Sequence, residues 1–414
     1  MKFIADFHIH SKYSRATSKD MDLESLDKWA KIKGIKVMGT GDFTHPEWLV
    51  NLKNKLEPAE EGLFKLKKDD QGTRFILTSE ISCIYSKNNK VRKVHILIFA
   101  PSFEIVDKIN FKLGAIGNLK SDGRPILGLD AKDLAKIALE ASSDCMVIPA
   151  HIWTPWFSLF GSKSGFNTIE ECFEEYSKYI YAMETGLSSD PAMNWKISFL
   201  DRITLISNSD SHSPRKIGRE ANMFDTELSY AGISDALKTK DSNKFLYTVE
   251  FYPEEGKYHF DGHRNCDVVL TPKETKKYNG ICPVCGKPLT VGVLNRVEEL
   301  SDRKDGFMPE NKIPFKSLVP LSEIISDVLG VGVASKAVEI EYNNLIKKVG
   351  SEFGVLLDAS ESSLKSATKS EIADGILKIR EGKVSKKPGY DGVYGKISVS
   401  VLKEDNSTNQ TTLF

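Results

Sequence analysis

Two histidines lie at alternate positions near the N-terminus, in the segment DFHIHSKYS that covers residues 6–14. Residues two apart on an extended strand share a face, so the imidazoles of His8 and His10 can reach one metal ion together. Asp6 has the same spacing, and its carboxylate can orient one of these imidazoles. The chain contains only eight histidines, so this pair indicates a metal site.

Further metal-ligand residues lie at the ends of apolar runs. They are Asp42, His45, Glu80, His95, His151, Asp210 and His212. A buried structural role explains any one histidine, but it does not explain the whole set. Imidazole and carboxylate ligands favour Zn²⁺, with Mn²⁺, Mg²⁺ or Fe²⁺ as alternatives, and a carboxylate can bridge two metals. The set predicts two to three divalent metals at a site that activates water and binds a phosphoryl group.

The elements that must position these ligands lie in residues 1–249, where short β-rich runs alternate with amphipathic segments. The predicted strands cover residues 2–10, 35–43, 73–82, 93–100, 145–151, 179–185 and 202–212. Helical patterns lie between them, at residues 22–34 and 130–143. This alternation predicts an α/β fold with a parallel barrel or layered sheet. The active sites of such barrels collect at the C-terminal ends of the strands, which is where these ligands lie.

The sequence contains, in this order, the motifs DFHIH, GDFTH, KVHIL, PAH and SDSH, and Glu80 lies between GDFTH and KVHIL. This set resembles the motifs of the polymerase-and-histidinol-phosphatase (PHP) family. The resemblance covers residues 1 to about 215. It implies a distorted seven-stranded β/α barrel that hydrolyses phosphoesters with a three-metal site. The metal ligands that it implies are His8, His10, Glu80, His95, His151, Asp210 and His212. The predicted catalytic residues are Asp6, His8, Asp210 and His212.

The second motif departs from the family pattern. Phe43 follows Asp42 where the family has an adjacent Asp-His pair, and His45 comes later. Either Asp42 or His45 is therefore the ligand at this position. Ser14 or Arg15 stands where the family has a further histidine, which predicts a weaker third metal site.

A separate zinc module is predicted in residues 250–302. Its ligands are His263, Cys266, Cys282 and Cys285. Their spacing and the turn CPVCGK are typical of a closed tetrahedral zinc site, with His259 as an alternative to His263. Four protein ligands leave no open position, so this zinc is predicted to be structural.

Residues 303–400 are predicted to form a mainly helical DNA-binding domain. Residues 376–396 hold six Lys and Arg against two acids. The predicted DNA contacts here are Lys386, Lys387, Tyr390 and Tyr394. Interleaved cations and aromatic rings suit phosphate contact and base stacking, although a solvated helix end explains the charges as well.

An aromatic segment follows His151 and carries Trp153, Trp156, Phe157 and Phe160. These side chains are predicted to line a pocket for a base extruded from the duplex. The alternative is that they form core at the rim of the barrel.

The last residues, 401–414, are polar and are predicted to be disordered. They end in QTTLF, in which Gln410, Leu413 and Phe414 resemble the peptide that docks DNA enzymes on a sliding clamp.

Lys plus Arg and Asp plus Glu number 57 each, so no global positive field favours nucleic acid, and binding must come from local patches. No apolar run has the length of a membrane span, and Asp6 interrupts any signal peptide. The expected location is the cytoplasm, in association with the nucleoid and not with a membrane.

The full layout of barrel, cysteine module and helical region ending KPGYDGVYGKI resembles the endonuclease Q family of DNA repair nucleases. This resemblance implies cleavage of the phosphodiester 5′ to a deaminated base (uracil, hypoxanthine or xanthine) or an abasic site, with damaged DNA as the partner. Two alternatives are a small-molecule phosphatase and a non-catalytic DNA-binding adaptor. About four metals per chain support the enzyme, and about one supports the adaptor.

Overall fold

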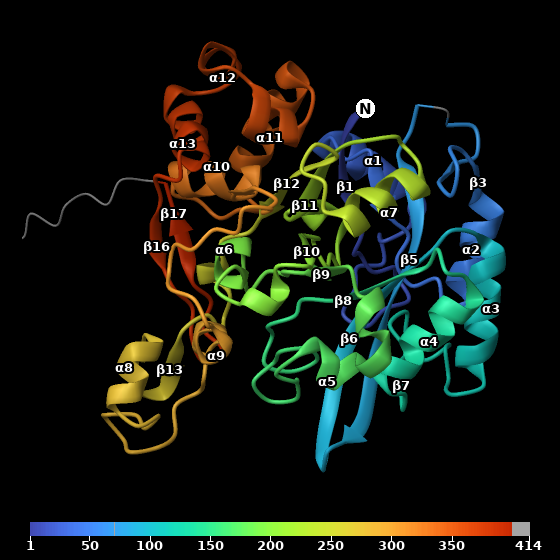
Figure 1. The fold of residues 1–414 in the computed structure, drawn as a ribbon. Coiled ribbons are helices and arrows are strands. Elements are labelled where there is room, and N and C mark those ends of the chain that lie inside the picture. Colours follow the sequence, from blue (N-terminus) through green and yellow to red (C-terminus); the bar gives the residue numbers. More distant parts are fainter. Residues whose placement is uncertain (70, 400–414) are drawn as a thin grey trace, which may run out of the picture.

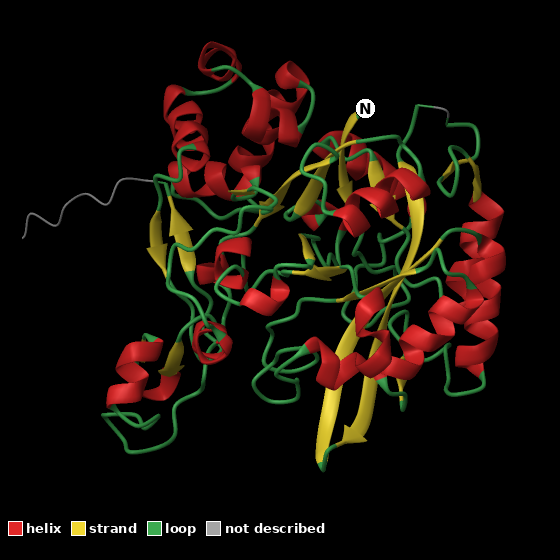
Figure 2. Ribbon diagram, viewed as in Figure 1, coloured by secondary structure: helices red, strands yellow, loops and turns green. Residues whose placement is uncertain are grey.

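A central sheet organises the first 250 residues in a computed structural model that describes residues 1–69 and 71–399 (Figures 1 and 2). Its strands are β1 (Lys2–Asp6), β2 (Val37–Gly39), β3 (Leu56–Pro58), β4 (Phe64–Leu66), β5 (Arg74–Lys87), β6 (Lys90–Ala100), β7 (Ile126–Leu127), β8 (Met146–Pro149), β11 (Ala221–Asp225), β12 (Phe245–Glu250) and β15 (Phe315–Ser317). The strand order is β15-β12-β11-β1-β2-β5-β4-β3, with β6 and β7 beside β5 and β8 beside β6. β1 is buried from Phe3 onward because it lies between β11 and β2.

A short parallel pair, β9 (Ala182–Glu184) and β10 (Thr204–Ile206), forms a separate two-stranded sheet beside β8. The Ile152 amide donates to the Glu184 carbonyl over 3.1 Å, which connects the segment after β8 to β9. A bridge between Ile9 and Ser211 connects the segment after β10 to the segment after β1. All seven predicted strands are present, and the α/β fold class is confirmed. The other strands of the central sheet, β3, β4, β7, β11, β12 and β15, were not predicted.

The helices that cover the sheet are α1 (Leu23–Lys33), α2 (Pro46–Lys55), α3 (Phe103–Gly114), α4 (Ala131–Ala141), α5 (Ile169–Phe173), α6 (Pro191–Asn194) and α7 (Tyr230–Thr239). These helices, except α2, begin at a residue whose side chain caps the first turn. Asp22 and Asp130 cap α1 and α4, the two helices predicted from periodicity, by accepting from backbone amides. Gly34 ends α1 with a φ of 86°, a conformation that favours glycine. Figure 1 shows α2, α3 and α4 together on one side of the sheet.

The cysteine module contains β13 (Asp261–His263), β14 (Val268–Leu270), α8 (Pro272–Lys277) and α9 (Val293–Leu300). It projects from the barrel at α8 and β13 (Figure 1), whereas its α9 contacts the barrel through Arg296. The helical region follows with α10 (Leu321–Leu329), α11 (Lys336–Val349), a π-helical turn (Gly354–Asp358), α12 (Glu361–Ala367) and α13 (Ser370–Arg380). A buried ion pair between Lys33 Nζ and Glu352 Oε2, 2.7 Å long, fixes this region against α1.

The predicted helical domain of residues 303–400 differs from the structure at both ends. β15 pairs with β12, so the central sheet takes a strand from this range. The hairpin of β16 (Ser385–Lys387) and β17 (Lys396–Ser398) returns to the cysteine module, where the Phe260 amide donates to the Gly389 carbonyl over 2.9 Å. Periodicity within residues 303–400 could not reveal these long-range pairings.

Within the described ranges, every helix is too short or too polar to cross a membrane.

Candidate metal centre

One buried carboxylate joins two groups of metal-ligand side chains. Glu80 lies inside β5, and its Oε2 is 3.4 Å from His8 Nε2 and 3.2 Å from His10 Nε2. Its Oε1 is 2.7 Å from His95 Nδ1 and 3.1 Å from His151 Nε2. Each oxygen of one carboxylate therefore faces a different group, which is the arrangement of a carboxylate that bridges two metal ions.

The first group consists of His8, His10, Glu80 and Asp210, whose donor atoms lie within 4.8 Å of one another. Asp210 Oδ1 is 3.1 Å from His10 Nε2 and 3.6 Å from His8 Nε2. His8 Nε2 is buried and has no hydrogen-bond partner among the described residues. A divalent ion would satisfy this nitrogen together with the two carboxylates, so the residues fit a metal.

The second group consists of Glu80, His95 and His151. The two ring nitrogens, His95 Nδ1 and His151 Nε2, are 3.2 Å apart, and both face the same Glu80 oxygen. Burial lowers the pKa of His95 to about 4, which keeps this imidazole in the neutral form that binds metal.

Neighbouring side chains keep the shared Glu80 carboxylate ionised. Burial acts to raise the pKa of Glu80, but His95 and Arg124 outweigh it and hold that pKa well below its usual range. Because His95 is neutral at pH 7, the charge that acts there is that of Arg124. Burial acts to lower the pKa of His8, but the carboxylates of Glu184 and Glu80 outweigh it and raise that pKa well above its usual value. The cluster therefore offers ionised oxygens to a cation, and a bound cation would displace protons from the imidazoles.

Backbone strain is concentrated at the same place. Asp42, His151 and Asp210 have φ angles of 50°, 31° and 45°. Residues other than glycine rarely adopt this left-handed region, and each such residue costs about 1–3 kcal/mol. Strain of this kind clusters at functional sites, which agrees with the position of these residues beside the two ligand groups.

Glu184 is a site residue that the sequence analysis missed. Both of its carboxylate oxygens lie 3.0 Å from His8 Nδ1, and the Asn208 side chain and the His151 amide also donate to it. A carboxylate that contacts the ring nitrogen on the far side from the metal fixes the tautomer of a metal-binding histidine and orients its ring. The sequence contained one signal for Glu184, because this acidic residue lies near the end of a predicted strand, as Glu80 does.

Asp42 and His45 both lie outside the two ligand groups. Asp42 Oδ1 is 3.0 Å from His10 Nδ1, and its Oδ2 accepts from Ser11 and Ser14. Asp42 is thus placed to orient His10, as Glu184 orients His8. The His45 ring is buried and stacks on Tyr13, with 4.4 Å between the centroids.

The partners of Asp6 and His212 also differ from expectation. Asp6 accepts from the Ser209 amide over 3.1 Å and the Gly218 amide over 2.8 Å, and no hydrogen bond joins it to a described histidine. The role of holding an imidazole is therefore wrong for Asp6, because β1 ends there and its carboxylate turns toward the segment that carries Asp210. His212 Nδ1 lies 3.0 Å from the Asp210 carbonyl oxygen, beside the first group but outside it.

The cysteine module contains a third group, formed by His263, Cys266, Cys282 and Cys285, with donor atoms within 4.8 Å of one another. Desolvation acts to raise the pKa of Cys282, but amides of the Cys282–Cys285 turn outweigh it and lower that pKa to about 7. This turn therefore favours a thiolate, the form that binds zinc. His259 is buried against Phe260 and lies outside the group.

The predicted base pocket is corrected at two positions. Trp153 and Phe160 are 1% and 0% exposed, and their rings pack in the core with centroids 5.1 Å apart. They leave no surface for a base. Trp156 is 43% exposed, and Phe157 contacts the His95 ring at 4.8 Å, so these two remain candidates.

The predicted DNA contacts of the hairpin region differ in exposure. Tyr390 is buried and donates to Asp267, whereas Tyr394 is 73% exposed. Lys386 pairs with Glu254 at 2.7 Å, and Lys387 is exposed. Tyr394 and Lys387 are therefore the members of this set that are free to meet a ligand from solvent.

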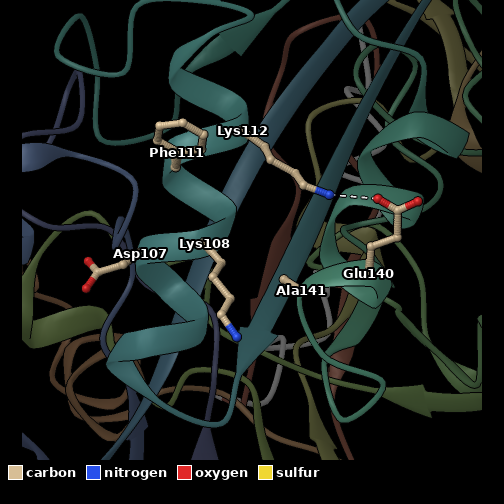
Figure 3. Close-up of a pocket in the computed structure, with 6 residues that line it drawn as sticks. All are labelled: Asp107, Lys108, Phe111, Lys112, Glu140 and Ala141. Atoms are coloured by element: carbon tan, nitrogen blue, oxygen red, sulfur yellow. Dashed lines mark hydrogen bonds and ion pairs between the residues drawn. The ribbon is translucent and has the colours of Figure 1, made fainter.

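A surface hollow of about 380 Å³ lies between α3 and α4 (Figure 3). Figure 3 shows that its polar lining includes the ion pair of Lys112 and Glu140, 2.7 Å long. None of its lining residues belongs to a metal-ligand group. The hollow is therefore separate from the candidate metal centre.

Comparison with curated proteins gives matches of very different extent. A family model described as the MJ0043 C-terminal domain matches residues 320–383, which contain the four helices from α10 to α13. YqxK of Bacillus subtilis is 30% identical over 420 residues, which cover 96% of this chain and 99% of YqxK. MJ0043 of Methanocaldococcus jannaschii is 37% identical over 267 residues, or 63% of this chain, but this chain spans only 33% of MJ0043.

Two solved structures match over nearly the whole chain. One is the lesion-specific endonuclease PfuEndoQ from Pyrococcus furiosus, with a TM-score of 0.86, 34% identity, and coverage of 96% of this chain and 95% of that one. The other is endonuclease Q in complex with a 27-mer duplex substrate that has an abasic lesion at the active site. Its TM-score is 0.84 at 33% identity, with 96% of each chain covered.

Proposed function

Because this chain belongs to the endonuclease Q family, we propose that it is a DNA repair endonuclease whose activity depends on metal. The bond that it cuts is the phosphodiester 5′ to uracil, hypoxanthine, xanthine or an abasic site, which leaves a 3′-hydroxyl and a 5′-phosphate. The observation that carries this proposal is the Glu80 carboxylate, which faces one ligand group with each oxygen. That arrangement suits two cations held side by side around a phosphate.

The site residues then have defined roles. Divalent cations at the two groups would lower the pKa of a water molecule and neutralise charge on the phosphoryl oxygens. His8, His10, Glu80 and Asp210 would hold one cation, and Glu80, His95 and His151 would hold the other. Glu184 and Asp42 orient the imidazoles of the first group through their second ring nitrogens. Zinc is the cation that this donor set favours, with manganese, magnesium or iron as alternatives.

His212 is placed to act at the mouth of the site. Its Nδ1 donates to the Asp210 carbonyl oxygen over 3.0 Å, which leaves Nε2 unprotonated in the neutral ring. Burial lowers the pKa of His212, so the neutral form prevails at pH 7. Nε2 can then accept a proton from water or bind a third, weaker cation.

Exposed and half-buried rings beside the segment that follows His151 form the proposed base-stacking surface. The Trp156 and Tyr258 rings meet edge to face, with 6.1 Å between centroids. Lys257 Nζ lies 5.6 Å from the Tyr258 ring and 5.8 Å from the Tyr394 ring. The segment after His151 therefore meets the C-terminal hairpin through a strip of rings and one cation, which suits unstacked bases and their phosphates. Lys387 would add a phosphate contact beside this strip.

The function is tested with end-labelled duplexes that carry one uracil, hypoxanthine, xanthine or abasic site, or none. We expect a single nick 5′ to each lesion, a spared unmodified duplex, and no nicking after chelation or in Asp210→Asn. Turnover of 4-nitrophenyl phosphate without DNA cleavage would instead favour a small-molecule phosphatase. DNA binding with about one metal per chain and no hydrolysis would favour an adaptor.

Gln410, Leu413 and Phe414 lie outside the described residues, and we propose that they dock on a sliding clamp. Deletion of residues 410–414 should abolish association with the purified clamp in gel filtration, because the Gln, Leu and Phe side chains supply the proposed anchors. Nicking of a short uracil duplex should stay unchanged. Undiminished clamp association would contradict this assignment.

A further inference from the structure

One arginine reaches the ligand groups from a loop that the metal motifs do not include. Arg124 lies between α3 and β7, and its Nη1 donates to Glu80 Oε2 over 3.1 Å. Among the described residues, it is the one Lys or Arg whose side chain contacts a carboxylate of either group. The contact places a permanent cation at the oxygen that His8 and His10 also face.

The backbone around Arg124 is held tightly. The Arg124 amide donates to Asp122 over 3.1 Å. The Gly123 amide donates to the Tyr13 carbonyl over 3.1 Å, and Thr44 Oγ1 donates to the Gly123 carbonyl over 3.2 Å. The loop is thus fixed to the first and second metal motifs, so Arg124 enters the site from a rigid support.

Gly123 permits this close approach. A Cβ atom at this position would lie 2.3 Å from Asp42 Oδ2 and 2.3 Å from Ser14 Oγ, both on side chains held by hydrogen bonds. Any larger residue would push the loop away from the site and withdraw the arginine. The local structure is therefore built to bring residue 124 to the metal ligands.

Most donors of the Arg124 guanidinium remain available. A guanidinium carries several N–H groups in a planar fork. Among the described side chains, the Arg124 guanidinium donates a hydrogen bond only to Glu80. The side chain is 28% exposed, so an anion can reach it from solvent. The fork matches the spacing of phosphate oxygens.

A cation bound at Glu80 Oε2 would weaken the hydrogen bond between this oxygen and Arg124. Two divalent cations would balance the carboxylates of Glu80, Asp210, Glu184 and Asp42, which leaves the positive charge of Arg124 for a further anion. A DNA phosphodiester is such an anion, and its non-bridging oxygens gain negative charge as water attacks the phosphorus.

We propose that Arg124 is a catalytic residue that donates to a non-bridging oxygen of the phosphate being cut. This inference rests on the proposed nuclease function. Arg124 exchanges no proton in this role; it stabilises the charge that develops while the 3′-oxygen departs. The competing role is that of a counter-ion that only holds Glu80 in place.

The test compares Arg124→Gln, Arg124→Lys and Arg124→Ala with Arg202→Gln as the matched control. Arg202 donates to the Ser177 and Ile180 carbonyls ahead of β9, at the opposite end of the barrel. The readouts are single-turnover nicking of a uracil duplex, metal content, and the salt dependence of binding to the already nicked product duplex, with metal present, by fluorescence anisotropy.

We expect Arg124→Gln to slow nicking by about 100-fold, the usual cost of losing one charge-stabilising donor. The slope of log affinity against log salt should fall by about one, because one phosphate contact is lost. Arg124→Lys should keep that slope and still cut slowly, since the fork is lost. Guanidinium chloride should accelerate Arg124→Ala more than equimolar sodium chloride does, and Arg202→Gln should match the wild type.

Unchanged rate and salt slope in Arg124→Gln, with or without a fall in metal content, would overturn the proposal and leave Arg124 as a counter-ion. If the wild-type protein nicks no lesion duplex, the proposed function fails instead. In that case, the anisotropy measurement on the nicked duplex with metal present still decides whether Arg124 contacts a phosphate.

Discussion

Replacement of Glu80 by glutamine should lower the single-turnover rate of nicking by about 10³-fold or more, equivalent to about 4 kcal/mol of barrier. Glutamine keeps the size of the side chain but removes the charge, and an amide is a poor bridge between cations. Both ligand groups use this carboxylate, so both should lose metal affinity. Metal analysis should accordingly show a loss of up to about two ions per chain, with the zinc of the cysteine module retained.

The matched control for this variant is Glu140→Gln. Glu140 forms a surface ion pair with Lys112 on α3 and α4, so its neutralisation should change neither the metal content nor the rate. The shared-carboxylate assignment would be contradicted by a Glu80→Gln protein that keeps its full metal content and cuts at the wild-type rate. Thermal unfolding of the metal-free proteins verifies that the fold is retained.

Local sequence was sufficient to predict most residues that the structure brings together in the ligand groups, and the strands that carry them. His8, His10, Glu80 and Asp210 each follow or end an apolar run, and short strands leave such residues at one end of a barrel. The caps at Asp22 and Asp130 likewise follow from neighbouring residues alone. These features depend on spacing within a few residues, which a sequence displays directly.

The residues that were missed or misassigned depend on tertiary contacts. Glu184 contacts His8 across 176 positions, and Arg124 contacts Glu80 across 44. No periodicity records which acid will orient a histidine or which loop will reach a carboxylate. Trp153 and Phe160 show the same limit, because an aromatic residue of the core and one that lines a pocket have the same sequence signal.

The two kinds of predicted metal site differ in how much the surrounding fold positions their ligand residues. Around Glu80, the ligands come from five separate segments of a large barrel whose strands hold them in place. The part of the cysteine module around its ligand group has a small apolar cluster of Val268, Cys282 and Leu289, whereas Val293 and Val297 of α9 belong to the main core. A cluster of this size supplies little hydrophobic stabilisation, so we expect a bound metal to hold this part of the module together.

Cys282→Ser should therefore remove one zinc per chain and unfold the cysteine module while the barrel stays folded. Structural zinc contributes about 10 kcal/mol or more to the folding of small modules, and a serine hydroxyl is a far weaker zinc ligand than a thiolate. Zinc released into a colorimetric chelator measures the stoichiometry, and limited trypsin digestion measures opening of the lysine-rich segment at α8.

Cys145→Ala is the matched control, because Cys145 is a buried free thiol of the barrel and lies outside every ligand group. It should keep the full zinc count and the wild-type digestion pattern. A Cys282→Ser protein with the same zinc count and the same resistance to trypsin would contradict the closed four-ligand site. Loss of barrel metals along with the zinc would show that the two centres are coupled. α9 offers a route for such coupling, because its Arg296 donates to the Phe160 and Phe166 carbonyls in the segment that follows His151.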